Sequence, residues 1–287
     1  MSPLRRVLGL LVALVGTALL LIGCDNTLDP ISNDGVFTIH GALNASVDRQ
    51  FIRVRDLNSP LTADATRDLD ATVRVENLRT GAVTPLRDSV KKFGNVYVHN
   101  FWADLNVEPD TEYRIVAERP DGATSTATMR TPAVIEVERT RTDGNCLDFY
   151  QVRFLGVREL NLIRTRIGFQ FEGRVFWVPR PTGFGGGTVS VSFQPEEVLA
   201  EEIGSQDNPS TRLRYEPRCL VLTDDTLRVA YKHLGPAWSG RIPGDLDFDP
   251  TASNDVDNGL GFFGGYREDT VAVRVDTSGV IQLGPGG

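Results

Sequence analysis

Residues 105–122 read LNVEPDTEYRIVAERPDG and carry the strand signal that decides the fold class. From Glu112 to Glu118, apolar and polar side chains alternate, as a half-buried antiparallel strand requires. The next residues, Pro120-Asp121-Gly122, are typical of a turn. We therefore predict a strand that ends in a turn at this point of the chain.

The same alternation repeats along the first half of the chain. The period-two runs are VFTIHGAL, FIRVRDL, ATVRVENL, NVYVHNF, EYRIVAER and ATSTATM, and turn formers such as Arg79-Thr80-Gly81 separate them. Six or seven short strands within about 100 residues are the signature of a β-sandwich. We assign residues 36–132 to this domain.

One segment resembles a known motif of β-sandwiches. Leu105, Pro109, Thr111 and Tyr113 match the tyrosine corner of fibronectin type III and other Ig-like domains. In that motif, a tyrosine at the start of a strand buries its ring while its hydroxyl bonds to the backbone of the preceding crossover. The resemblance implies an Ig-like first domain in which Tyr113 is structural.

Strand patterns continue after Pro132 and predict a second β-rich domain over residues 133–287. Its runs are VIEVERTRT, FYQVRFLG, RIGFQFEGRVFWV, TVSVSFQ, RLRYEPRCLVL, TLRVAYKHL and TVAVRV. One short helix is expected from Pro195, because Glu196 and Glu197 suit the positive end of a helix and Gly204 can cap it. The predicted fold class is all-β: an Ig-like or fibronectin type III-like sandwich, then a β-rich domain with one short helix.

The start of the chain has the layout of a secretory signal. Arg5 and Arg6 precede an uninterrupted apolar or small run, Val7 to Gly23, that ends at Cys24. The run is short for a transmembrane helix, which needs about 20 apolar residues. One interpretation is an ordinary signal peptide, in which the cysteine at position 24 is incidental. The other interpretation is a lipoprotein signal.

Leu21-Ile22-Gly23-Cys24 resembles the lipobox of bacterial lipoproteins, in which the cysteine is acylated and becomes the first residue. The resemblance implies a signal peptide at residues 1–23 and a lipid anchor, palmitate among its acyl chains, on Cys24. Several acyl chains make a lasting anchor, because each buried CH₂ contributes about 0.8 kcal/mol. The polar residues 24–35 are then a tether between lipid and fold.

The charge of the chain narrows the class of partner. Removal of Arg5 and Arg6 with the signal peptide moves the formal net charge from −8 to −10. An acidic protein is poorly suited to nucleic acid or to anionic lipid headgroups. We therefore expect no nucleic-acid partner, and a covalent attachment to the membrane.

Cys146 and Cys219 remain as an even pair in an oxidising compartment, and we predict a disulfide between them. It would close a loop of roughly 70 residues and stabilise the fold by about 4 kcal/mol on the chain-entropy model. Two separate buried thiols are the alternative. Two distant cysteines without a nearby histidine do not provide a four-coordinate metal site.

The other candidates for chemistry are weak. His40, His99 and His233 lie in distant segments, and no G-x-S-x-G nucleophile motif occurs. Asp245, Asp247 and Asp249 alternate as in a calcium-binding EF-hand loop, but Pro250 and Val256 occupy its glycine and glutamate positions. The three aspartates remain weak calcium candidates, with a solvated loop as the default, and no cofactor is predicted.

Near the end of the chain, Gly259, Gly261 and Gly264 have the G-x-G-x-x-G spacing of a dinucleotide site. A strand-like run, TVAVRV, follows instead of a helix, and too little chain remains for further βαβ units. We expect these glycines where a strand bends or another backbone comes close, with Phe262 or Phe263 turned into the core.

Aromatic side chains offer a second possibility. Phe169, Phe171, Phe176 and Trp177 crowd one strand region, while Trp102 and Trp238 lie near turns. Most are expected in the core. An exposed subset would suit sugars or a partner protein.

Cys24, FTIHGALN at 37–44 and SNDVDNGLGFFGGY at 253–266 resemble an uncharacterised group of Gram-negative lipoproteins that share a domain of unknown function. The resemblance implies a place at the outer membrane, often beside TonB-dependent transporters, and a role in nutrient capture. It provides no catalytic residues.

We therefore expect a non-enzymatic, lipid-anchored binding or accessory protein that assists uptake. An envelope hydrolase acting on polysaccharide or peptide, through carboxylates such as Glu172 or Asp247, is one alternative. A purely structural surface module is the other.

Overall fold

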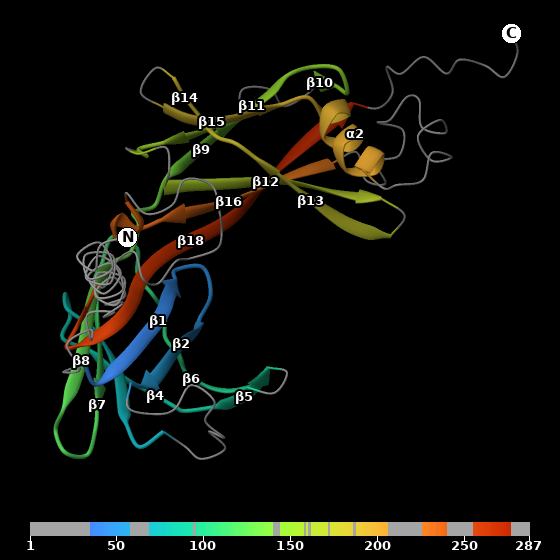
Figure 1. Ribbon diagram of the computed structural model, residues 1–287. Coiled ribbons are helices and arrows are strands. Elements are labelled where there is room, and N and C mark those ends of the chain that lie inside the picture. The colour runs from blue at the N-terminus through green and yellow to red at the C-terminus, as the bar shows by residue number, and fades with distance from the viewer. Residues whose placement is uncertain are drawn as a thin grey trace, which may run out of the picture. The chain divides into compact units, whose positions relative to one another are not determined.

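The computed structural model describes residues 35–57, 69–93, 96–139, 144–157, 159, 162–171, 173–185, 188–205, 226–239 and 255–276 (Figure 1). The expected signal peptide, residues 1–23, lies outside these ranges, as does the expected tether, residues 24–35, apart from Gly35. Within them, no helix is both long and apolar enough to cross a membrane.

The described strands form three sheets, and the fold is all-β with one α-helix among these residues. The nine-stranded sheet has the order β13 (Arg174–Arg180), β12 (Ile163–Phe171), β16 (Thr226–Leu234), β18 (Gly259–Asp276), β1 (Phe37–Asn44), β2 (Arg49–Asp56), β6 (Val96–Asp104) and β5 (Val90–Phe93), and β10 (Gly144–Asn145) also pairs with β18.

The two smaller sheets each belong to one half of the chain. The five-stranded sheet has the order β17 (Val256–Asp257), β8 (Thr124–Arg130), β7 (Glu112–Glu118), β3 (Thr72–Asn77) and β4 (Val83–Leu86). The four-stranded sheet has the order β14 (Gly183–Gly185), β15 (Thr188–Phe193), β11 (Tyr150–Leu155) and β9 (Glu136–Arg139).

The first core lies between the five-stranded sheet and the first-half strands of the nine-stranded sheet. Alternation along β2 buries Gln50, Ile52 and Val54, while Arg49, Phe51 and Arg53 stay exposed. Ile52 and Val54 join a cluster with Val73 and Ile115 of the five-stranded sheet. The predicted Ig-like β-sandwich is confirmed.

Tyr113 is the second residue of β7, and its side chain is fully buried. Its hydroxyl accepts a hydrogen bond from the Glu108 N–H at 2.9 Å. The buried ring and the bond to the preceding crossover are those of a tyrosine corner.

The second core lies between the four-stranded sheet and β12, β13, β16 and the end of β18. Ile167, Phe169 and Val229 meet Val152 and Val191 there. The run RIGFQFEGRVFWV forms a hairpin of β12 and β13, in which Gly173 has φ +75°. The predicted helix is α2 (Pro195–Ser205). The predicted strand RLRYEPRCLVL lies outside the described residues.

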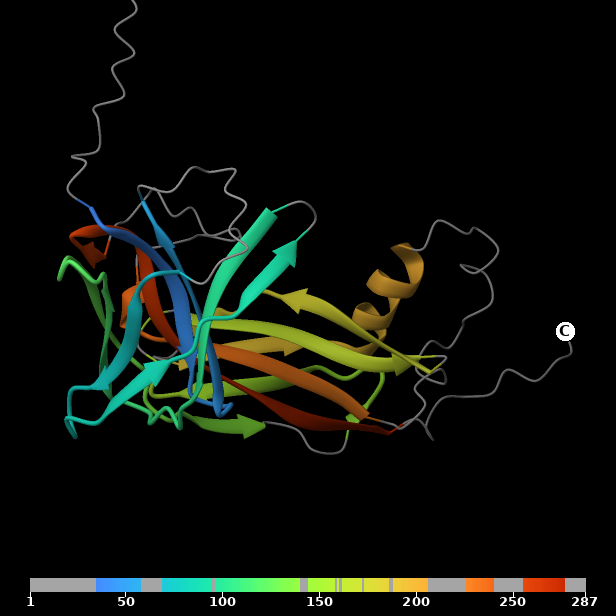
Figure 2. The ribbon, with the colours of Figure 1, turned by 90° about the horizontal axis from the view of Figure 1, so that it is seen from below.

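The last strand belongs to both sandwiches. Residues 259–266 of β18 pair parallel to β1, and residues 266–274 pair antiparallel to β16 (Figures 1 and 2). Phe263 lies in the first core, and Val273 lies in the second. The predicted ranges 36–132 and 133–287 place this strand in the second domain, and its pairing joins it to strands of both ranges. The described residues from Val36 onward belong to one compact unit.

The glycines of β18 lie at close approaches to neighbouring groups. A Cβ at Gly259 would lie 2.4 Å from the Phe37 carbonyl oxygen, and one at Gly264 would meet the Phe262 ring at 2.6 Å. Gly261, at φ +124°, is the most crowded, because a Cβ there would lie 2.0 Å from the Ile39 carbonyl oxygen. The structural interpretation of these glycines is confirmed, and both Phe262 and Phe263 are buried.

Candidate binding surface

The two hydrophobic cores lie on the same side of the nine-stranded sheet. The odd-numbered Phe263, Val273 and Val275 of β18 belong to the cores. Because successive side chains of a strand alternate between faces, even-numbered residues such as Tyr266 and Glu268 lie on the opposite side. We call this side, across β13, β12, β16, β18, β1, β2 and β6, the outer face.

On β13 and β12, the outer face carries an arginine against a tryptophan. Trp177 pairs opposite Gly168, and its ring occupies the space of the missing side chain, since a Cβ at Gly168 would lie 2.5 Å from ring carbon Cζ3. The guanidinium carbon of Arg166 lies 4.6 Å from the centroid of the Trp177 ring. A cation at this distance is attracted by the electron-rich face of the ring.

On β2 and β6, the same combination occurs around Trp102. Trp102 pairs opposite Phe51, which is 52% exposed. The guanidinium carbons of Arg49 and Arg87 lie 4.9 and 5.5 Å from the Trp102 ring centroid. Arg49 also donates to Asp104 at 2.8 Å, and this hydrogen bond raises the pKa of Arg49 and lowers that of Asp104.

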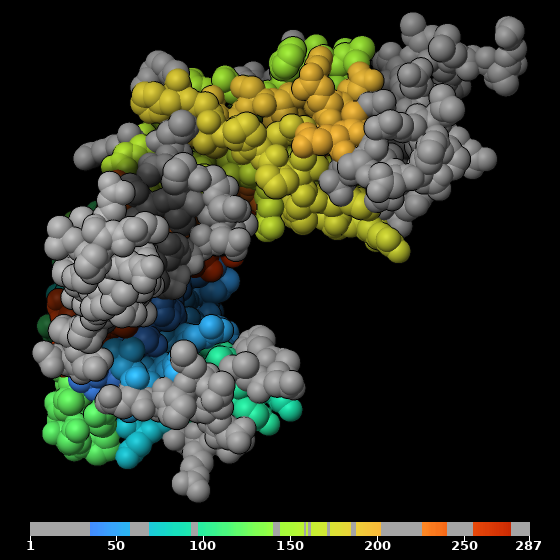
Figure 3. Space-filling view, in the orientation of Figure 1, coloured from blue at the N-terminus to red at the C-terminus, as the bar shows by residue number. Residues whose placement is uncertain are grey.

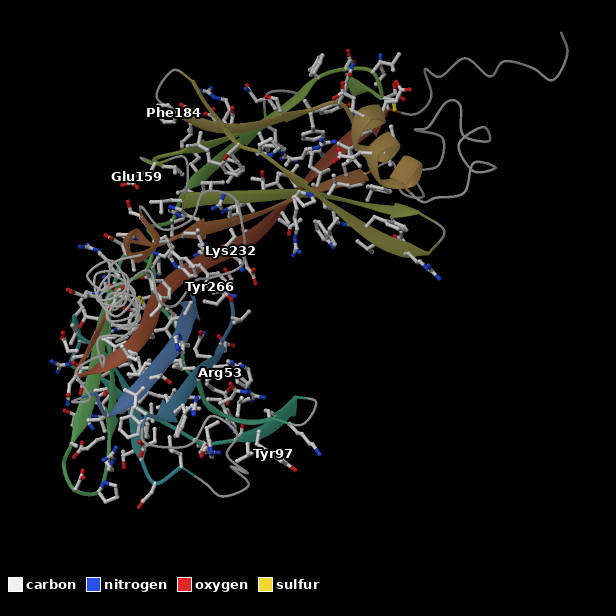
Figure 4. The ribbon with its side chains drawn as sticks, in the orientation of Figure 1. Arg53, Tyr97, Glu159, Phe184, Lys232 and Tyr266 are labelled. Carbon is white, nitrogen blue, oxygen red and sulfur yellow. The ribbon has the colours of Figure 1, made fainter. Side chains whose placement is uncertain are left out.

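Between these two groups, Lys232 of β16 lies over Tyr266 of β18. The Lys232 ammonium is 4.2 Å from the Tyr266 ring centroid and 3.8 Å from Glu268 Oε2. The Asn44 amide donates to Glu268 Oε1 at 3.0 Å. Burial raises the pKa of the Tyr266 hydroxyl, which is therefore uncharged at neutral pH. Figure 4 shows Lys232, Tyr266 and Arg53 on the same side of the sheet.

His40 and Arg53 are opposite each other on β1 and β2, and Arg53 is also opposite Asn100 of β6. Burial, and then the charge of Arg53, lower the pKa of His40 below its ordinary value of 6.5. His40 is therefore neutral at pH 7, and the positive charge at this part of the outer face comes from Arg53.

Trp238 covers one part of the outer face. It ends the 3₁₀ turn η3 (Pro236–Trp238), packs edge-on against Phe262 with ring centroids 4.6 Å apart, and donates from Nε1 to the Gly265 carbonyl at 3.1 Å. Of the aromatic candidates, Phe169 and Phe176 pack together on the second core. Trp102 and Trp177 are the two tryptophans on the open part of the outer face.

The three histidines occupy separate environments. His40 is on the outer face, whereas His99 faces the first core, with Nδ1 2.7 Å from Asp88 Oδ2. His233 is buried on β16, and burial lowers its pKa although a hydrogen bond with the Ala133 backbone opposes this. Among the residues that the structure describes, no three His, Cys, Asp or Glu side chains gather as metal ligands.

Several predicted site residues lie outside the described ranges. These are Cys24, Glu172, Cys219, Asp245, Asp247 and Asp249. Cys146, the other predicted disulfide cysteine, is buried in the second core. The calcium loop, the lipid anchor and the disulfide therefore stay predictions.

The arginine–aromatic pairs of the outer face were not predicted from the sequence. Arg53, Arg166 and Lys232 occupy polar positions of strand-like runs in the sequence, but their partners come from other strands. The one usable signal was Gly168 within a strand, because a missing side chain often marks a place where a neighbouring ring packs.

Comparisons with known proteins leave the family open. No family model matches the chain, and no curated protein matches it. Among solved structures, a pullulanase from Anoxybacillus sp. LM18-11 is similar at 7% identity and TM-score 0.23, over 68% of this chain and 24% of the pullulanase.

Two further solved structures are similar to this chain at low identity. The chicken CNTN1 FN1–FN3 domains are 13% identical with TM-score 0.18, over 83% of this chain and 65% of theirs. A Ca²⁺-stabilised ice-binding adhesin of an Antarctic bacterium is 10% identical with TM-score 0.19, over 84% of this chain and 49% of the adhesin. The chain thus spans less than two thirds of each of these proteins, and the similarities carry no functional argument.

Proposed function

We propose that this protein is a lipid-anchored, non-enzymatic binding or accessory protein of the cell envelope. Acylated Cys24 holds it at the outer membrane, and it assists nutrient uptake by a larger transporter, such as a TonB-dependent one. The lipobox-like Leu21–Cys24 and the resemblance of 253–266 to outer-membrane lipoproteins support the location.

The open outer face is the observation that carries the binding role. It presents Arg53, Arg166 and Lys232 on strands that share one continuous hydrogen-bonded sheet. Because β18 is paired in both sandwiches, the two halves of this surface are held by one backbone. Side chains on strands backed by two packed cores are positioned more firmly than side chains on loops. A purely structural module would not need such an array.

The anchor is tested by replacing Cys24 with serine. Membranes of cells that make the wild-type protein should contain it in the outer-membrane fraction, labelled by a palmitate analogue. Cys24→Ser should abolish the label and release the protein from that fraction, whereas Cys146→Ser, which removes a different cysteine, should keep both. Label on Cys24→Ser would contradict the assignment of the lipid site.

The accessory role is tested by affinity capture of the anchored protein from native membranes. We expect a transporter to be recovered with wild-type protein and lost with Cys24→Ser. Recovery of the protein alone, at several detergent strengths, would overturn the accessory role.

A further inference from the structure

We propose that the outer face binds an acidic polysaccharide, a sugar chain that carries carboxylate or sulfate groups. This inference rests on the proposed envelope-binding function and specifies its ligand class. The contacts of the outer face indicate that the ligand is anionic and that it is extended. They also favour a polysaccharide over nucleic acid or a membrane surface.

The cations of the outer face are held in place before any ligand arrives. Arg166 is 4.6 Å from the centroid of Trp177, Arg49 is 4.9 Å from that of Trp102, and Lys232 is 4.2 Å from that of Tyr266. A side chain already held against a ring loses less conformational freedom when it binds. A guanidinium group also offers paired donors that match the oxygens of a carboxylate or sulfate. This pre-organisation favours anions.

Two carboxylates on this face, those of Asp104 and Glu268, are already engaged. Asp104 is bonded to Arg49 at 2.8 Å, and Glu268 accepts from Asn44 at 3.0 Å and lies 3.8 Å from Lys232. Arg53, by contrast, faces the neutral imidazole of His40 and the amide of Asn100 across the strands. A chain with net charge −8 therefore carries a local positive surface, and an acidic ligand is complementary to it.

The spacing of the cations favours a polymer over a small anion. Arg166 on β12 and Arg53 on β2 are separated by β16, β18 and β1. With strands about 4.8 Å apart, four steps across the sheet amount to about 19 Å. Arg166 is in register with Thr270 of β18 and Arg53 with Phe262, so the two cations are also offset by eight residues along the strands. A free sulfate or phosphate can contact one end of this row only, whereas a chain of several sugars can contact both ends.

The aromatic rings argue against neutral sugars and nucleic acid. Arg49 and Arg87 both lie over Trp102, and Trp177 is packed on Gly168 with Arg166 nearby. Stacking of a nucleobase, or of an uncharged sugar ring, requires an open aromatic face. Here the two tryptophan rings orient the cations instead.

The form of the surface argues against a membrane as its partner. Figure 3 shows the molecule hollowed between β13 and the β1–β2 pair, on the side where Figure 4 places Lys232, Tyr266 and Arg53. A flat layer of lipid headgroups does not follow a hollowed surface. An extended chain can lie along it.

The test measures binding of the full chain, in detergent micelles, to polygalacturonate and to dextran sulfate, with uncharged dextran as reference. Affinity electrophoresis should show retardation by one or both acidic polymers and none by dextran. The retardation should weaken as sodium chloride rises, because salt screens exposed charges. Retardation by dextran equal to that by the acidic polymers would overturn the proposal, as would no retardation by either acidic polymer.

Two variants at opposite ends of the row locate the site. We expect Arg53→Gln and Arg166→Gln each to weaken binding by about five- to tenfold, the usual scale for one charge-assisted contact. The matched control is Arg130→Gln, because Arg130 is also exposed but lies on β8 of the five-stranded sheet, paired with Asp110 at 2.9 Å. Thermal unfolding midpoints would show that each variant folds. If Arg166→Gln disturbs the packing of Trp177, the Arg53→Gln variant still tests the binding site. An equal loss of binding in Arg130→Gln would overturn the assignment to the outer face.

The remaining outcomes separate this inference from the proposed function. Tighter binding to phosphatidylglycerol vesicles or to a single-stranded oligonucleotide than to either polysaccharide would overturn the ligand class. If the protein is anchored and recovered with a transporter but does not bind acidic polysaccharides, the ligand inference is overturned and the proposed function stands. Binding of acidic polysaccharide by a protein that never carries lipid on Cys24 would overturn the anchor and leave the surface assignment in place.

Discussion

Gly261 lies so close to Ile39 that a single added carbon would collide with it: a Cβ at Gly261 would be 2.0 Å from the Ile39 carbonyl oxygen. The contact occurs inside the parallel pairing of β1 and β18, where these two residues are partners. Gly261 also has φ +124°, a conformation that side chains of L-residues rarely adopt. The pairing that joins the end of the chain to the first sandwich thus requires glycine here.

Gly261→Ala is therefore expected to lower the free energy of unfolding by about 2–3 kcal/mol, because the clash is with backbone and the conformation is strained. Chemical denaturation monitored by circular dichroism would measure the loss. Gly183→Ala is the control, since a Cβ at Gly183 meets nothing within 4 Å. Equal stabilities of the two variants would show that β18 does not pair with β1 as described.

Tyr113→Phe removes the hydroxyl that accepts the Glu108 N–H. We expect a loss of about 1–2 kcal/mol, because a donor of the crossover loses its partner while the ring stays buried. Tyr97→Phe, which removes a hydroxyl from a half-buried tyrosine of β6, should cost less than half as much. A neutral effect of Tyr113→Phe would contradict a stabilising tyrosine corner.

Stability should depend on pH through His233. Burial lowers its pKa below 6.5 in the folded protein, so the unfolded chain binds a proton more readily than the folded one. The contribution of His233 is thus fully present above pH 6.5 and is lost as the pH falls from 6.5 toward the lowered folded pKa. Denaturation at pH 7.5, 6.5 and 5.5 would show the decline.

The variant His233→Gln should flatten this part of the stability profile. Burial also lowers the pKa of His40. The same measurement on His40→Gln therefore gives the contribution of His40 to the pH dependence of stability. An unchanged slope between pH 7.5 and 5.5 in His233→Gln would exclude His233 as a source of the pH dependence.

The predicted pairing of Cys146 with Cys219 can be checked by mass spectrometry of proteolytic peptides without reduction. A linked peptide that contains both residues is expected, and Cys219→Ser should lower the free energy of unfolding by about 4 kcal/mol on the chain-entropy model. Under reducing conditions, wild type and Cys219→Ser should have similar stability. Separate peptides for the two cysteines would refute the pairing.

Much of the fold followed from local patterns. Alternation located β1, β2, β3, β7 and β8, because one face of each strand is buried and the other is wet. The short strands β4 and β5 were not predicted, since four residues give too few alternations to identify a strand. The run 166–178 was predicted as one strand region rather than a hairpin, because Gly173 is the only local mark of its turn.

The candidate surface was the part least accessible to sequence reasoning. The sequence shows that Arg53, Arg166 and Lys232 occupy polar positions of strands, and that Trp102 and Trp177 lie in strand regions. It does not show which strands pair with each other, and the surface is formed by side chains of paired strands. The pairs Arg166–Trp177 and Lys232–Tyr266 exist only through the pairing of β12 with β13 and of β16 with β18.

By itself, the sequence determined the all-β class, the tyrosine corner and the place of the helix, because each depends on residues close together in the chain. Only the tertiary structure decided that β18 completes both sandwiches and that one face of the shared sheet collects the cations. Ser46 and Glu268, for example, are 222 positions apart, yet the Ser46 hydroxyl donates to the Glu268 carbonyl at 2.6 Å. Such contacts form because β18 contributes side chains to both hydrophobic cores. The pattern of residues within one strand does not reveal this arrangement.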